Sequence, residues 1–258
     1  QKGIIRHVLI RMNHNQEMLV VFVCHKPLPN KQAWVEKLTK RYPKICGIVE
    51  NINSKSTNVI LGKKHETLFQ QDYIYDQLFD LTFKISYDAF FQVHRSQTEV
   101  LYQHILHFAN PTKDDIIIDA YCGCGTISLF MARRAKKVIG IEVVKKAIDS
   151  ARENAKQNNI SNVVFMVGKV ENHLATFKDE KPNILIVDPP RKGLDESIVD
   201  AIIAHSMPKV VYVSCNIATL ARDLARLKTH YTTRKVQLVD MFPNTTSIEA
   251  VCVLDRKD

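Results

Sequence analysis

From Asp114 onward, short apolar segments alternate with amphipathic ones, and this limits the folds that the chain can adopt. The apolar segments, which predict strands, are residues 116–121, 138–142, 163–167, 184–188 and 210–215. The segments with helical spacing are residues 127–134, 145–157, 196–205 and 218–228. Such alternation predicts a parallel sheet with helices on both faces. Residues 235–240 and 249–254 predict two more strands with no helix between them, and therefore an antiparallel hairpin at one edge of a seven-stranded sheet.

The first part of the chain predicts a separate, smaller α+β domain. Strands are expected at residues 4–11, 18–24, 45–51 and 58–61, a helix at 32–41, and a further helix at 99–108. We therefore expect a central α+β domain at residues 1–90 and a catalytic domain at 91–258. Residues 1–98 hold 14 Lys or Arg against 8 Asp or Glu. Because a surplus of basic side chains favours phosphate backbones, this front domain is predicted to contact RNA.

Composition excludes several classes of protein. No apolar run approaches the roughly 20 residues that span a bilayer, so we expect no membrane association. The six cysteines are scattered and none forms a two-residue-spaced pair, which predicts free thiols, a cytoplasmic location and no metal. No obligate protein partner is indicated. The chain begins at Gln1 and shows no pattern typical of a signal peptide, so we expect a fragment of a longer protein.

Polar residues follow the predicted strands, where open parallel sheets bind their ligands. The first strand runs into an Asp-x-x-x-Gly-x-Gly turn at 119–125, and the second ends at Glu142, a carboxylate suited to ribose hydroxyls. This pairing resembles the cofactor half of class I S-adenosylmethionine-dependent methyltransferases. The fourth strand ends in Asp188, followed by Pro-Pro-Arg. An aromatic ring after the prolines would indicate methylation of an exocyclic amine, and Arg191 stands there instead.

Cys215 ends the fifth strand, and a helix is predicted to begin soon after it. A helix amino terminus stabilises a thiolate, which favours Cys215 as a nucleophile. A thiolate that adds to carbon 6 of uracil makes carbon 5 nucleophilic, which direct attack on a sulfonium methyl requires. Glu249, at the start of the last strand, is the candidate base that removes the carbon 5 proton. The alternatives are a buried structural cysteine and a solvated edge-strand carboxylate.

Five motifs occur in the order typical of the RNA uracil-5 methyltransferase family, and the chain most resembles its bacterial 23S ribosomal RNA branch. They lie at residues 90–93, 119–125, 188–193, 214–216 and 248–249. The resemblance implies that Cys215 is the nucleophile and Glu249 the base, acting on RNA. It also implies which residues hold S-adenosylmethionine: Gln92, Tyr121, Thr126, Glu142 and Asp188.

Family members usually add an amino-terminal RNA-binding barrel, and many bind an iron–sulfur cluster upstream of the region present here. The chain is therefore expected to bind RNA more weakly than the whole protein. A stacked base cannot reach the strand ends, so the uridine should be flipped out or unpaired, with Phe90, Phe91 and Tyr121 as candidate stacking partners. Three other functions stay open: a transfer RNA uracil-5 methyltransferase, an amine-directed methyltransferase that needs no thiol, and an RNA-binding module without activity.

Overall fold

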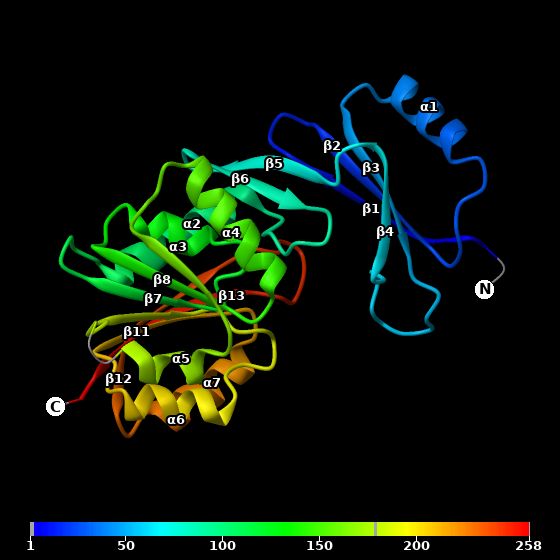
Figure 1. The fold of residues 1–258 in the computed structure, drawn as a ribbon. Coiled ribbons are helices and arrows are strands. Elements are labelled where there is room, and N and C mark those ends of the chain that lie inside the picture. The colour runs from blue at the N-terminus through cyan, green and yellow to red at the C-terminus, as the bar shows by residue number, and fades with distance from the viewer. Residues whose placement is uncertain (1–2, 178–179, 258) are drawn as a thin grey trace. The chain divides into compact units, whose positions relative to one another are not determined.

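The chain divides into two compact units, residues 1–90 and 91–258. The computed structural model describes residues 3–177 and 180–257. Figure 1 labels the elements of both units. Within the described residues, every helix is too short or too polar to cross a bilayer.

The first unit contains a four-stranded sheet, one helix and a separate hairpin. The elements are β1 (Ile5–Met12), β2 (Met18–Cys24), α1 (Lys31–Arg41), β3 (Ile45–Ile52), β4 (Lys64–Gln70), β5 (Tyr73–Leu78) and β6 (Leu81–Ser86). The sheet order is β1-β2-β3-β4, and β5 pairs with β6. β2 and β3 are parallel because α1 forms the crossover between them, and the other pairs are antiparallel.

The strand predicted at residues 58–61 is wrong, because this segment is a loop that precedes β4. Two asparagine side chains bind its backbone in place of a strand partner. Asn51 exchanges two hydrogen bonds with the backbone of Gly62, at 2.9 and 2.6 Å, and Asn53 Nδ2 donates to the Val59 carbonyl at 2.7 Å. Hydrogen bonds from Asn51 and Asn53 therefore set the conformation of this apolar segment, and the sequence of the segment itself does not reveal them.

The second unit is a seven-stranded sheet in the order β12-β13-β11-β10-β7-β8-β9. Its strands are β7 (Ile116–Ala120), β8 (Lys137–Glu142), β9 (Val163–Val167), β10 (Ile184–Val187), β11 (Lys209–Ser214), β12 (Tyr231–Val239) and β13 (Glu249–Arg256). β13 runs antiparallel to both β11 and β12, and the central strands are parallel. The predicted α/β sheet with a terminal antiparallel hairpin is confirmed.

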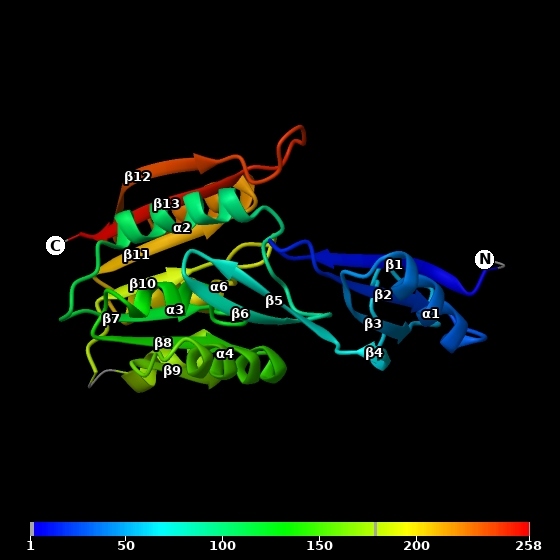
Figure 2. The same cartoon turned by 90° about the horizontal axis from the view of Figure 1, so that it is seen from above.

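Helices cover both faces of this sheet. α2 (Arg95–Ala109), α3 (Thr126–Ala132) and α4 (Lys145–Gln157) lie on one face, whereas α5 (Val170–Leu174), α6 (Glu196–Ala204) and α7 (Ile217–Leu227) lie on the other (Figures 1 and 2). A 3-10 turn, Ala175–Phe177, follows α5. Because both faces are covered, central strand residues such as Ile118, Leu185 and Tyr212 are fully buried. Burial of each such apolar side chain contributes roughly 1.5–3 kcal/mol.

The strand order reverses between β7 and β10. The connection after β7 leads to the helices on one face, and the connections around β10 lead to those on the other. In open sheets the loops that leave such neighbouring strands diverge, which leaves a crevice at the carboxyl ends of the strands. The fold therefore locates the candidate site at the ends of β7 and β10 before any side chain is considered.

Candidate active site

Two groups of polar residues lie along the carboxyl edge of the sheet. The glycine-loop half is formed by residues 119–125 after β7 and by Glu142 at the end of β8. The thiol half is formed by residues 188–193 after β10, Cys215 after β11 and Glu249 at the start of β13.

Strand register brings the predicted thiol and the predicted base together. Ser214 pairs with Ala250, so Cys215 and Glu249 stand at the ends of adjacent strands although 34 positions separate them in the sequence. On the other side of β11, Val187 pairs with Tyr212, so Asp188 leaves the next strand at the same edge. The sheet thus assembles three ionisable groups from three strands.

Asp119 is the buried acid of the glycine-loop half. Its side chain is fully buried, and Ser128 Oγ donates a hydrogen bond to Oδ2. Oδ1 has no hydrogen-bond partner within the described part of the chain. Burial, reinforced by the charge of Glu142, raises the pKa of Asp119 to about 7. An unsatisfied buried acceptor is costly, which makes this carboxylate suited to a ligand that donates or carries positive charge.

The backbone after β7 takes a left-handed conformation at three positions. The φ angles are 65° at Tyr121, 54° at Gly123 and 87° at Gly125. A Cβ on Gly125 would lie 2.9 Å from the Phe165 ring, whereas a Cβ on Gly123 would meet no atom within 4 Å. The loop is therefore tight on its inner side and open at Gly123. Tyr121 is an aromatic residue in a conformation that side chains rarely adopt, which is a feature of functional loops.

The other predicted cofactor residues occupy different environments. Thr126 begins α3, and its Oγ1 lies 2.6 Å from Tyr102 Oη in a hydrogen bond. Glu142 accepts a hydrogen bond from the Val144 amide at 2.9 Å, which fixes the side chain at the strand end. Gln92 is partly buried in the segment immediately before α2. Their roles as cofactor ligands stay predictions.

Cys215 is partly buried and lies one residue before the helix cap. Asn216 caps α7 by accepting hydrogen bonds from Ala218 N and Thr219 N. Burial raises the pKa of Cys215, and the charges of Glu249 and Asp188 raise it further, against a lowering by Arg191. The carboxylates and burial thus outweigh the helix amino terminus.

Both acids of the thiol half also have raised pKa values. Glu249 is 4% exposed, and burial raises the pKa of its carboxyl against the opposing charge of Arg191. Burial raises the pKa of the partly buried Asp188 to about 8, with further contributions from Glu249 and then Asp119. Asp188 therefore interacts with the acids of both halves. A carboxyl with a raised pKa is a stronger base once it is ionised, which suits Glu249 to accepting a proton.

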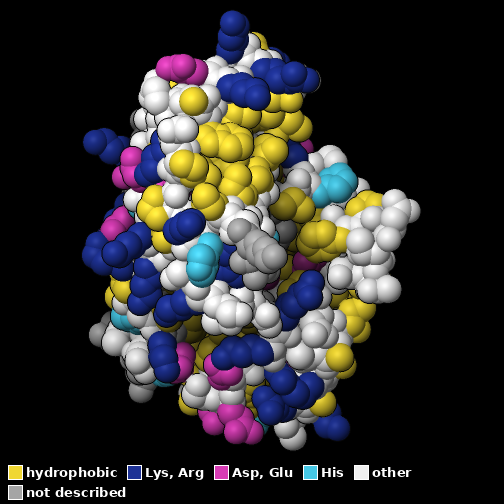
Figure 3. Space-filling model, turned by 90° about the vertical axis from the view of Figure 1, so that its right-hand side faces the viewer, with side chains coloured by type: hydrophobic (Ala, Val, Ile, Leu, Met, Phe, Trp, Pro, Cys, Tyr) yellow, Lys and Arg dark blue, Asp and Glu magenta, His cyan; other side chains and the backbone are white. Residues whose placement is uncertain are grey.

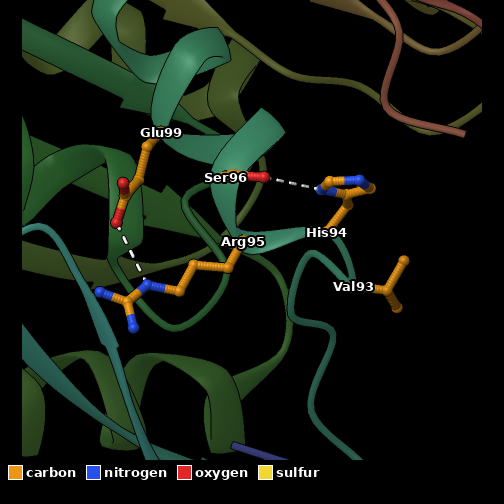
Figure 4. Close-up of a pocket in the computed structure, with 5 residues that line it drawn as sticks. All are labelled: Val93, His94, Arg95, Ser96 and Glu99. Carbon is orange, nitrogen blue, oxygen red and sulfur yellow. Dashed lines mark hydrogen bonds and ion pairs between the residues drawn. The ribbon is translucent and has the colours of Figure 1, made fainter. Parts of the chain in front are cut away.

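A pocket of about 580 Å³ lies at the start of α2 (Figure 4). It is lined by Val93, His94, Arg95, Ser96 and Glu99. Arg95 Nε pairs with Glu99 Oε1 at 3.2 Å, and Ser96 Oγ lies 3.3 Å from His94 Nδ1. The pocket begins directly after Gln92 and includes none of the predicted site residues. Across residues 3–177 and 180–257, no cluster of three or more His, Cys, Asp or Glu could hold a metal ion.

Sequence reasoning gave no role to three residues that the structure makes prominent. Asp119 was part of a motif, but only the fold reveals its unpaired oxygen. Arg191 served only as evidence against amine methylation, whereas its charge lowers the pKa values of Cys215 and Glu249. Asp223, on α7, is fully buried. An acid within an otherwise apolar helical stripe was the one available signal for it.

The sheet order, the glycine loop and the acid at the end of β8 define the class I methyltransferase fold. A family model described as tRNA (Uracil-5-)-methyltransferase matches residues 8–257. The chain belongs to this family, and the resemblance to RNA uracil-5 methyltransferases is confirmed.

Relatives in bacteria carry names of the same kind. An uncharacterized RNA methyltransferase of Oceanobacillus iheyensis is 47% identical, over 99% of this chain and 57% of its own length. One from Staphylococcus aureus strain MW2 is 42% identical, over 100% of this chain and 58% of its own. The chain therefore spans somewhat more than half the length of these curated relatives.

Two solved structures extend the comparison. The Pyrococcus abyssi tRNA (uracil-54, C5)-methyltransferase, in complex with S-adenosyl-L-homocysteine, has a TM-score of 0.81 at 28% identity, covering 98% of this chain and 60% of its own. The Methanocaldococcus jannaschii tRNA m1G37 methyltransferase, at 13% identity, has a TM-score of 0.62 and covers 100% of this chain and 77% of its own. The second similarity concerns the fold alone.

Proposed function

We propose that this chain forms the catalytic part of an S-adenosylmethionine-dependent RNA uracil-5 methyltransferase, with residues 1–90 as a domain that contacts RNA. The observation that carries the proposal is the meeting of Cys215, Glu249 and Asp188 at adjacent strand ends, next to the glycine loop. An amine-directed methyltransferase needs neither the Cys215 thiol nor Glu249 as a base. Family membership and the RNA methyltransferase names of the relatives support the same activity.

In the proposed reaction, the Cys215 thiolate bonds to carbon 6 of uracil, and the electrons of the 5,6 double bond move into an enolate. Carbon 5 would then take the methyl group of a sulfonium, whose sulfur–methyl bond breaks so that the sulfur leaves as a thioether. Glu249 takes the proton from carbon 5, the 5,6 double bond re-forms, and the bond to sulfur breaks to release Cys215 as a thiolate. Covalent addition thus divides one difficult step into easier ones. Because Glu249 is buried and its pKa is raised, it is a competent acceptor for that proton.

The residues present fit S-adenosylmethionine, which supplies an electrophilic methyl group on a sulfonium. This molecule also carries an ammonium group, so both of its cationic centres favour nearby carboxylates. The unpaired Oδ1 of Asp119 and the open backbone at Gly123 support binding at the glycine loop. We propose that Gln92, Tyr121, Thr126, Glu142 and Asp188 hold it. The Pyrococcus abyssi structure, solved with S-adenosyl-L-homocysteine, adds support.

The proposed substrate is a flipped or unpaired uridine in 23S ribosomal RNA, modified in the cytoplasm. Free thiols at all six cysteines support a reducing compartment. Transfer RNA is the second candidate, favoured by the family description and by the name of the Pyrococcus abyssi enzyme. The basic balance of residues 1–98 supports an RNA partner. Figure 3 shows one face on which Lys and Arg side chains border a group of apolar side chains.

RNA that contains 5-fluorouridine tests the proposal directly, because fluorine on carbon 5 blocks proton removal. With S-adenosylmethionine, we expect the protein to form an adduct with RNA that survives denaturing electrophoresis. Cys215→Ala should form none, and Cys46→Ala, which changes a partly buried thiol of the first unit, should form it normally. Methyl transfer at full rate by Cys215→Ala would refute the proposal. Separate 23S ribosomal and transfer RNA transcripts decide between the two substrates.

A further inference from the structure

The loop after β10 is fastened to α7 by residues that the proposed reaction does not use. Asp223 is fully buried, and its Oδ2 accepts hydrogen bonds from the Leu194 amide and from Tyr212 Oη, each at 2.8 Å. Arg222 Nε donates to Asp223 Oδ1 at 2.9 Å. Arg222 Nη2 also donates to the carbonyls of Lys192 at 2.8 Å and Leu194 at 3.3 Å. Two neighbouring residues of α7 thus bind the loop backbone, Asp223 through an amide and Arg222 through two carbonyls.

Gly193 fits this arrangement because the loop runs directly against the carboxylate. Its φ angle is 77°, and a Cβ at this position would lie 2.4 Å from Asp223 Oδ2 and 2.6 Å from Arg222 Nη2. A side chain at position 193 would therefore push the loop away from α7. The buried carboxylate of Asp223 faces a loop that carries site residues. An apolar side chain in its place would leave the Leu194 amide and the Tyr212 hydroxyl without their acceptor.

A third contact ties the loop to the turn that follows the nucleophile. The single hydroxyl proton of Thr219 is shared between two carbonyls, with Oγ1 3.2 Å from the Arg191 oxygen and 3.0 Å from the Asn216 oxygen. Asn216 directly follows Cys215 and caps α7. The backbone of Arg191 is therefore held against the first turn after the thiol. We call the side chains of Tyr212, Thr219, Arg222 and Asp223 the Asp223 clamp.

Resting on the proposed function, we propose that Asp223 is a positioning residue: its clamp holds the backbone of Arg191 against the turn after Cys215, so that the cationic side chain of Arg191 stabilises the anionic forms of Cys215 and Glu249. The charge of Arg191 lowers the pKa of both groups, against burial, which raises both. A loosened loop removes the cation from the thiol even though every reacting residue is still present.

The pH dependence of Cys215 alkylation tests this without cofactor or RNA. Iodoacetamide labels thiolates, and mass spectrometry of the peptide that contains Cys215 separates it from the other five cysteines. We expect Arg191→Gln to move the midpoint of labelling upward by about 0.5–1 pH unit. Arg222→Ala and Thr219→Val should move it in the same direction by less. Arg234→Ala is the matched control and should leave the midpoint unchanged, because Arg234 pairs with Asp255 on β13 and not with a residue of the clamp.

A purely structural clamp would lower stability and leave the midpoint where it is. An unchanged midpoint in Arg191→Gln would overturn the role of Arg191, and an unchanged midpoint in both Arg222→Ala and Thr219→Val would overturn the role of the clamp. Thr219→Val removes one hydroxyl and keeps the test available if Arg222→Ala does not fold. In methyl-transfer assays, the clamp variants should lose several-fold in kcat with unchanged KM for S-adenosylmethionine. If the wild-type protein transferred no methyl group, the proposed function would be refuted. The pH dependence of Cys215 alkylation would still test the clamp in that case.

Discussion

The glycine-loop half and the thiol half lie on one sheet edge, yet their polar groups are held in different ways. In the glycine-loop half, local hydrogen bonds orient the side chains: Ser128 donates to Asp119, and the Val144 amide donates to Glu142. In the thiol half, burial raises the pKa values of Cys215 and Glu249, as it does that of Asp119, and the charges of Glu249 and Asp188 raise the pKa of the thiol further. Fixed geometry suits the binding of a ligand, and shifted pKa values suit the movement of protons. The comparison predicts that substitutions in the two halves fail differently.

The largest expected effect comes from Glu249→Gln, in the thiol half. An amide of the same size keeps the packing but cannot accept the proton from carbon 5. Loss of such a base lowers rates by about 10²–10⁴-fold. RNA without 5-fluorouridine should then stay covalently attached to Cys215 once carbon 5 is methylated, and denaturing electrophoresis would show the adduct. Glu196→Gln, at a glutamate whose side chain is 82% exposed, is the control. A variant that methylates at the normal rate would remove the distinction between the halves.

An intermediate effect is expected from Glu142→Gln, in the glycine-loop half. Loss of charge-assisted hydrogen bonds costs roughly 1.5–3 kcal/mol, or about 10- to 100-fold in affinity. Calorimetric titration with S-adenosylhomocysteine measures this loss directly. At saturating S-adenosylmethionine, kcat should equal that of the wild type, because Glu142 takes no part in proton transfer. A fall in kcat with unchanged affinity would mean that the two halves share one role.

The smallest expected effect is on stability and comes from Asp188→Asn. The pKa of Asp188 is about 8 in the folded protein, against an ordinary value near about 3.9. The folded state thus binds the proton more tightly, and the free energy of unfolding contributed by this group falls as pH rises between these two values. Asparagine removes that loss, so the melting temperature of the ligand-free protein at pH 8 should rise by at least about 2–4 °C, the shift that roughly 1 kcal/mol gives in a protein of this size.

Melting curves from pH 5 to pH 8 check this prediction. Asp200→Asn, at an exposed position of α6, is the matched control and should follow the wild-type curve. Asp119 has a similarly raised pKa of about 7, so the Asp188→Asn protein should keep part of the pH dependence. Unchanged pH dependence in Asp188→Asn would place the charge cost at the other buried acids, Asp119 and Glu249.

The sequence by itself determined the sheet, the class of methyltransferase and the family. Strands that are covered on both faces need unbroken apolar runs, which the sequence shows directly. The order of the motifs at the strand ends does not depend on the length or conformation of the loops. It failed at residues 58–61, where asparagine side chains bind the backbone, and it did not predict the β5–β6 hairpin.

Only the tertiary structure decided how the site groups affect one another. The direction of the Cys215 pKa depends on Glu249 and Asp188, which belong to other strands. The contact between Asp223 and Leu194 joins residues 29 positions apart. Burial and Coulomb interactions depend on distances in space, and a linear pattern carries no measure of such distances until the strands are in register.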